Sequence, residues 1–92
     1  MKIDLSEIQI LPIKPRNGLL AFVSFVLNSS FYIGDVALYS RLDAKGYRLV
    51  YPRRTLPNGK EIECFHPINR EAAQAIEGQV FEVFGRLIEK LR

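Results

Sequence analysis

The chain has 92 residues, the size of one small domain, so we expect a single domain over residues 1–92. Its 48% hydrophobic and 25% charged residues exclude an intrinsically disordered chain. The net charge of +3 is unevenly spread, because the segment from Arg41 to Lys60 holds six basic residues and one acidic residue. Such a segment suits a polyanion such as nucleic acid; a solvated hairpin edge is the alternative.

The N-terminal part of the chain is predicted to begin with a β-strand. Residues Lys2–Leu11 alternate between apolar and polar. The apolar parity switches near Ser6 and Glu7, which indicates a bulge. Two prolines and an Asn-Gly pair predict a loop over Pro12–Gly18.

Two longer strands are predicted to pair next. Leu19–Leu27 is apolar on both faces, and Asn28–Ser30 turns it back into Phe31–Tyr39 as a hairpin. A polar connection, Arg41–Gly46, leads to a short strand over Tyr47–Tyr51.

The last strand is predicted to follow a tight turn. Pro52 ends the preceding strand by removing a backbone donor. Leu56–Gly59 matches a type I turn, and Glu61–Phe65 returns as a strand. We therefore expect one sheet of about five strands, mainly antiparallel.

One long helix is predicted to close the domain. Asn69 is a good N-cap, and an apolar stripe then recurs at three- and four-residue steps. The stripe consists of Ala73, Ile76, Val80, Val83, Phe84, Leu87 and Leu91. The fold class is α+β, with the helix packed on the sheet.

Features outside that stripe predict a homodimer. Phe81 and Ile88 flank the stripe, and Gly78 and Gly85 lie further round, where small residues allow close approach by another chain. Leu19–Leu27 also needs cover on the side away from the helix. A wide core stripe with two tolerated glycines is the alternative.

Catalytic and metal-binding chemistry is not indicated. Cys64 and His66 lack a third orienting group, and one Cys with one His falls short of a structural zinc site. We expect a buried Cys64 and a His66 that braces the turn at Pro67. No glycine motif suggests a phosphate loop. The chain is expected to have no enzymatic activity, small-molecule substrate or cofactor.

The sequence also predicts a cytoplasmic protein. A single cysteine points to a reducing compartment, and the acidic N-terminus differs from a secretion signal. The apolar run Leu19–Leu27 is too short to cross a bilayer as a helix, so no membrane partner is expected.

A basic hairpin is the remaining candidate site. Arg53 and Arg54 follow Pro52, Lys60 lies across the turn, and Tyr51 is adjacent. Arginine forks bind phosphate oxygens, and an aromatic ring can stack on an unpaired base.

The motifs FYIGDV, YRLVYPRR, LPNGKE and FHPIN, followed by an Ala/Ile/Val/Phe helix, resemble the SpoVG family (stage V sporulation protein G, septation protein) between Phe31 and Leu87. The resemblance implies a dimeric α+β domain and a bacterial regulator of sporulation, septation or virulence genes that binds DNA and, in some members, RNA. It implies binding by the helix and nearby basic residues, here Arg53, Arg54, Arg70 and Arg86.

The leading hypothesis is thus a dimeric nucleic-acid-binding regulator. Arg53 and Arg54 would contact phosphates, supported by Lys60, Arg48 and Arg70. The alternative is a module that recruits a division or regulatory protein through the sheet edges and through Phe81, Gly85 and Ile88, which are also the predicted dimer interface.

Overall fold

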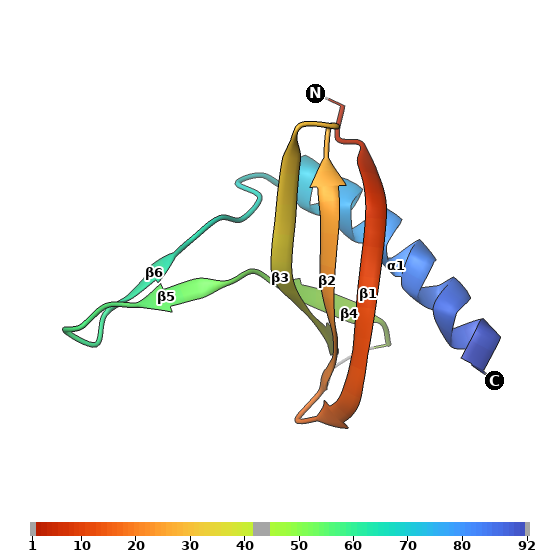
Figure 1. The fold of residues 1–92 in the computed structure, drawn as a ribbon, viewed down its shortest axis with the longest axis horizontal. Helices are drawn as coiled ribbons and strands as arrows, with labels where there is room; N and C mark the ends of the chain where they lie inside the picture. Colours follow the sequence, from red (N-terminus) through yellow and green to blue (C-terminus); the bar gives the residue numbers. More distant parts are fainter. Residues whose placement is uncertain (1, 42–44, 92) are drawn as a thin grey trace.

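The computed structural model describes residues 2–41 and 45–91, so the predicted connection Arg41–Gly46 lies partly outside the described residues. A four-stranded antiparallel sheet has the order β1-β2-β3-β4, and β5 and β6 form a separate two-stranded sheet. One helix follows (Figure 1). The α+β class is confirmed. The elements are β1 Leu5–Arg16, β2 Leu19–Leu27, β3 Phe31–Ser40, β4 Tyr47–Val50, β5 Arg53–Thr55, β6 Glu61–Glu63 and α1 Arg70–Leu91.

Two of the predictions made from the sequence are wrong, one for a strand and one for a loop. The predicted strand Glu61–Phe65 does not join the main sheet, because β6 pairs with β5 beyond Pro52. The predicted loop Pro12–Gly18 is largely strand, since β1 continues to Arg16. Prolines are tolerated there because β1 is the outer strand of the sheet and needs donors on one side only.

The register shifts four times in the described β1–β2 and β2–β3 pairings, and two of these shifts are bulges that carry a residue with positive φ. The predicted one is confirmed: the β1–β2 register shifts between Ser6 and Gln9, and Glu7 has a φ of 49°. The second lies where the β2–β3 register shifts between Val23 and Phe25, and there Asp35 has a φ of 60°. Bulges with a residue in the left-handed region re-aim the neighbouring side chains.

The β2–β3 hairpin is also confirmed. Asn28 and Ser29 both have positive φ, at 48° and 57°, as a tight primed turn requires. The Asn28 side chain accepts a hydrogen bond from the Asp4 amide at 2.8 Å, which ties this turn to the start of the chain.

The helix packs on the sheet along an i, i+4 row instead of a straight stripe. Ala73, Val83 and Leu87, predicted to face the sheet, are half-buried and lie outside the core cluster. Because an i, i+4 row winds around the helix, contact shifts along α1 as the helix crosses the sheet. The side chain of Leu91 lies outside the described part. The buried row is Ala72, Ile76, Val80 and Phe84, set against Ala21, Val23, Phe25, Val36 and Leu38.

Two side chains fix the helix in place. Asn69 Oδ1 accepts the Ala72 amide at 2.8 Å, which confirms the predicted N-cap. Gln79 accepts the Leu5 amide at 3.0 Å and donates to the Ile3 carbonyl at 3.1 Å, so it joins α1 to the start of β1.

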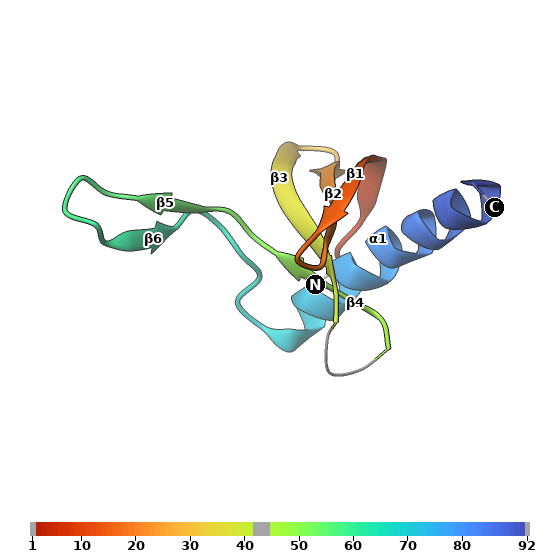
Figure 2. The same ribbon diagram turned by 90° about the horizontal axis from the view of Figure 1, so that it is seen from below.

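The fold leaves two surfaces without cover. Figure 2 shows α1 on one side of the four-stranded sheet, with no other described element on the opposite side, here called the open face. The β5–β6 hairpin, here called the arm, projects away from the body in both views (Figures 1 and 2). Within the described residues, α1 lacks the apolar length that a bilayer-spanning helix needs.

Candidate nucleic-acid interface

The arm is closed by the predicted turn. The Gly59 amide donates to the Leu56 carbonyl at 2.9 Å, and the Leu56 amide donates to the Lys60 carbonyl at 2.7 Å. Asn58 Oδ1 accepts the Lys60 amide at 3.0 Å. Gly59 has a φ of 85°, which glycine adopts without a steric penalty. The prediction of a Leu56–Gly59 turn is confirmed.

The register of the arm separates the two adjacent arginines. Arg53 lies opposite Glu63, Arg54 opposite Ile62, and Thr55 opposite Glu61. Successive side chains of a strand point to opposite faces, so Arg53 and Arg54 face away from each other. One face of the arm, the acidic face, carries Arg53, Thr55, Glu61 and Glu63, and the other, the basic face, carries Arg54, Leu56, Lys60 and Ile62.

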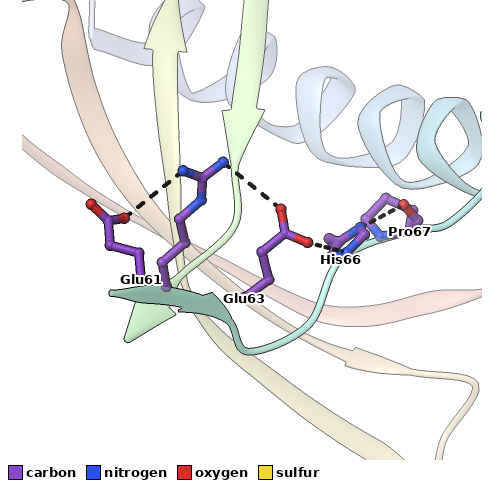
Figure 3. A network of polar contacts seen from close by, with 5 residues as sticks. Glu61, Glu63, His66 and Pro67 are labelled. Carbon is purple, nitrogen blue, oxygen red and sulfur yellow. Dashed lines mark hydrogen bonds and ion pairs between the residues drawn. The ribbon is translucent and has the colours of Figure 1, made fainter. Parts of the chain in front are cut away.

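Arg53 is engaged within the acidic face. Its guanidinium lies 3.8 Å from Glu61 Oε2 and 3.8 Å from Glu63 Oε1 (Figure 3). Exposed pairs of this kind contribute only about 0–1 kcal/mol to stability. They do, however, place two carboxylates beside the one cation, so this face repels a phosphate more than it attracts one.

The basic face has no such compensation. Arg54 and Lys60 are exposed, and within the described residues their side chains have no ion pair. Ile62, directly opposite Arg54, is 44% exposed, and Leu56, opposite Lys60, is half-buried. The basic face thus carries two cationic side chains, Arg54 and Lys60, beside two apolar ones on a projecting hairpin.

The other predicted binding residues are dispersed. The Arg48 guanidinium lies 4.9 Å from the centroid of the Tyr39 ring, a cation–π contact. Arg86 Nη2 lies 2.5 Å from Glu82 Oε1 one turn earlier in α1. Arg70 is exposed at the first residue of α1. The structure thus brings together Arg54 and Lys60 on one face of the arm.

The residues predicted to form a dimer interface are partly used by the fold. Phe81 and Ile88 are half-buried and pack against the core, and the Phe81 ring lies 5.8 Å from that of Tyr47. Gly85 has open space where a side chain would lie. The interface itself stays a prediction.

Cys64 and His66 differ in their surroundings. Cys64 is exposed, so the expectation of a buried cysteine is wrong: the arm lifts it clear of the core. His66 Nδ1 lies 3.0 Å from the Pro67 carbonyl oxygen, and Nε2 lies 2.5 Å from Glu63 Oε2 (Figure 3). Those contacts fit the predicted bracing role of His66 at the Pro67 turn.

The base of the arm is fixed by two aromatic rings. Tyr51 and Phe65 meet edge to face at 6.1 Å between centroids, and both pack against the core. Burial, and then the nearby Glu77 carboxylate, raise the pKa of Tyr51 to about 12. Its buried hydroxyl has no hydrogen-bond partner among the described residues, so Tyr51 is an anchor of the arm and not a freely exposed stacking ring.

Sequence reasoning missed a hollow of about 520 Å³ on the open face. Its lining includes the polar side chains of Gln9, Ser24 and Asp35 beside the Tyr32 ring. The one sign of this hollow in the sequence is the pair Gly34-Asp35 within an apolar strand. The pair can be recognised as a bulge only when the register with β2 is known.

Comparisons with known proteins identify the family of the chain. The SpoVG family model matches residues 1–86. A relative from Desulforudis audaxviator is 26% identical over 81 residues, covering 88% of this chain and 90% of its own length. Relatives from Bdellovibrio bacteriovorus and Clostridium beijerinckii are 23% and 22% identical, covering 94% and 95% of this chain and 77% and 93% of their own lengths. All three bear the name septation protein SpoVG. The chain belongs to the SpoVG family.

Proposed function

We propose that this protein is a non-enzymatic regulator that binds DNA or RNA through the basic face of its arm. The names of its relatives support a role linked to septation. The observation that carries the proposal is the exposed pair Arg54 and Lys60 on a ribbon that projects from the body (Figure 1).

A projecting two-stranded ribbon has the right shape for this task. The major groove of B-DNA admits such a ribbon, and unpaired RNA is more open still. Arg54 provides a planar fork for phosphate oxygens, and Lys60 provides a point charge across the turn. Glu61 and Glu63 belong to the opposite face, which would point away from the polyanion.

The proposal is tested by charge reversal on the basic face. The double variant Arg54→Glu and Lys60→Glu is expected to lose at least tenfold in affinity for random-sequence DNA or RNA pools at low salt. The matched control reverses two exposed cations of β1, Lys14→Glu and Arg16→Glu, with the same change in net charge. Unchanged binding by the arm variant would show that the arm is not the contact.

Recruitment of a division or regulatory protein is the second candidate. The open face favours it, because Leu11 is 66% exposed and Tyr32 is 73% exposed on a sheet with one covered side. In that case the protein binds neither nucleic-acid pool, and the open face has a protein partner.

A further inference from the structure

The open face holds a hollow of about 520 Å³ that the proposed function does not use. Its lining combines the apolar Leu11 and Phe22 with the polar Gln9 and Asp35. A second hollow of about 190 Å³ shares part of this lining and adds Glu7. The residues that line the two hollows include two carboxylates and no lysine or arginine, so this part of the open face attracts a cation.

The Tyr32 ring, which also lines both hollows, lies against the backbone of Gly34. A Cβ atom at Gly34 would lie 2.9 Å from Tyr32 Cε2 and 3.2 Å from Cζ, so the ring occupies the space that glycine leaves. Tyr32 is nevertheless 73% exposed, so the rest of the ring meets solvent. A ring that is seated on one side and open on the other is a platform on which a flat group can stack.

Asp35 adds an uncompensated negative charge to the same hollow. It lies at the bulge between β2 and β3, and its φ of 60° is a conformation that aspartate tolerates better than most residues. The residue is exposed, and within the described part of the chain its carboxylate forms no ion pair. A cation that stacks on Tyr32 therefore has a free carboxylate in the same hollow.

A guanidinium is the cation that uses both groups. Its flat face stacks on an aromatic ring, and its N–H groups pair with a carboxylate, whereas an ammonium group is a strongly hydrated point charge. The same strand shows the stacking contact within the chain, because the Arg48 guanidinium lies 4.9 Å from the centroid of the Tyr39 ring. Among the described residues, no cation stacks on Tyr32.

The surroundings of the hollow fit an arginine side chain of a protein better than a free small molecule. The open face is uncovered (Figure 2), whereas small ligands are usually buried over most of their surface. A protein segment brings further residues with its arginine. Leu11, 66% exposed in the lining of the hollow, offers an apolar contact to one of them.

We infer that the open face is a docking site for an arginine side chain of a partner protein, which stacks on Tyr32 and pairs with Asp35 while an apolar neighbour of that arginine packs on Leu11. This inference does not rest on the proposed function, because the basic face of the arm takes no part in it. Arg54 stays free for a phosphate. One molecule can therefore hold nucleic acid through the arm and a partner protein through the open face.

Titration of the ¹⁵N-labelled full chain with three short blocked peptides, followed by NMR, tests the inference. The peptides share a serine-rich sequence in which one leucine stands beside a central arginine, lysine or citrulline. The arginine peptide is expected to shift the amide signals of Tyr32 and Asp35. It should bind about tenfold more tightly than the citrulline peptide, whose side chain is flat but neutral. The lysine peptide should fall between the two.

Three variants of the site should weaken binding of the arginine peptide. Tyr32→Ala and Asp35→Asn should each do so about threefold to fivefold, the loss that corresponds to one exposed cation–π contact or one exposed ion pair. Each should also reduce the preference for arginine over citrulline. Gly34→Ala keeps the tyrosine but displaces its ring, and we expect a similar loss.

Two control variants are matched to these. Phe31→Ala removes a neighbouring ring, 64% exposed, that lies on the other side of the strand. Arg54→Glu removes the proposed contact with nucleic acid. Both should bind the arginine peptide as the wild type does. The two proposals can thus fail separately, because nucleic-acid binding depends on Arg54 and peptide binding does not.

Three results would overturn the inference. One is a wild type that binds no arginine peptide, or binds the arginine and citrulline peptides equally. Another is an affinity for the arginine peptide that both Tyr32→Ala and Asp35→Asn leave unchanged. The third is a shift of the Tyr32 and Asp35 signals with protein concentration alone, which would show that a second copy covers the open face.

Discussion

Arg53 and Arg54 differ in their surroundings because neighbouring residues of a strand face opposite ways. Arg53 has two glutamates within 3.8 Å, whereas Arg54 lies opposite Ile62. The sequence alone predicted both as equal phosphate contacts. Their separation depends on the β5–β6 register, which pairs Arg53 with Glu63 and is set by the length of the turn.

A second residue-scale feature, the buried hydroxyl of Tyr51, gives a pH prediction. Its pKa rises from 10.0 to about 12 in the folded protein, so the folded state keeps this proton when the unfolded chain has lost it. The contribution of the protonated Tyr51 hydroxyl to the free energy of unfolding is therefore complete below about pH 10, and it is lost as the pH rises toward about 12. Tyr51→Phe removes the group, and we expect its unfolding free energy to fall less over that range.

Urea unfolding at a series of alkaline pH values measures this difference. At neutral pH, Tyr51→Phe should be as stable as the wild type or more stable by up to about 1 kcal/mol, because a buried hydroxyl without a partner is removed. Tyr32→Phe, a change at an exposed ring, is the control. If the unfolding free energy of Tyr51→Phe falls with pH as steeply as that of the wild type, the Tyr51 hydroxyl is not the cause of the loss.

At the scale of elements, the arm and the body depend on different contacts. The body is held by α1 on the sheet, with Phe84 at 6% exposure and edge to face with Tyr47 at 5.1 Å. The arm is anchored at its base by Tyr51 and Phe65. Substitutions along the arm should therefore leave the stability of the body nearly unchanged.

Phe84→Ala and Ile62→Ala test this independence. Phe84→Ala should cost about 3–5 kcal/mol of unfolding free energy, the usual range for truncating a buried phenylalanine. Ile62→Ala, at a residue 44% exposed in the arm, should cost less than about 1 kcal/mol. Chemical denaturation monitored by circular dichroism measures both, and a large loss in Ile62→Ala would show that the arm is part of the core.

Local signals predicted most elements but not their assembly. The N-cap at Asn69, the turn at Leu56–Gly59 and the bulge near Ser6 each depend on a few adjacent residues, and each is confirmed. The separation of β6 from the main sheet could not be predicted, because pairing partners lie far apart in sequence. The Tyr32–Asp35 hollow likewise forms only when β1, β2 and β3 are side by side.

Over the whole molecule, charge is segregated. The net charge is +3, yet the open-face hollows are acidic and the basic face of the arm is cationic. The proposed nucleic-acid contact follows from this separation. The proposed binding of nucleic acid thus depends on one surface, the basic face of the arm.

The most direct test of that claim is the salt dependence of nucleic-acid binding in two single variants. Arg54→Ala and Arg53→Ala remove the same charge from adjacent positions on opposite faces. For duplex DNA, each lost phosphate contact lowers the steepness of log K against log salt by about 0.9. Arg54→Ala should show this change, and Arg53→Ala should keep the wild-type slope. Equal slopes in the two variants, or a change in Arg53→Ala alone, would contradict the account.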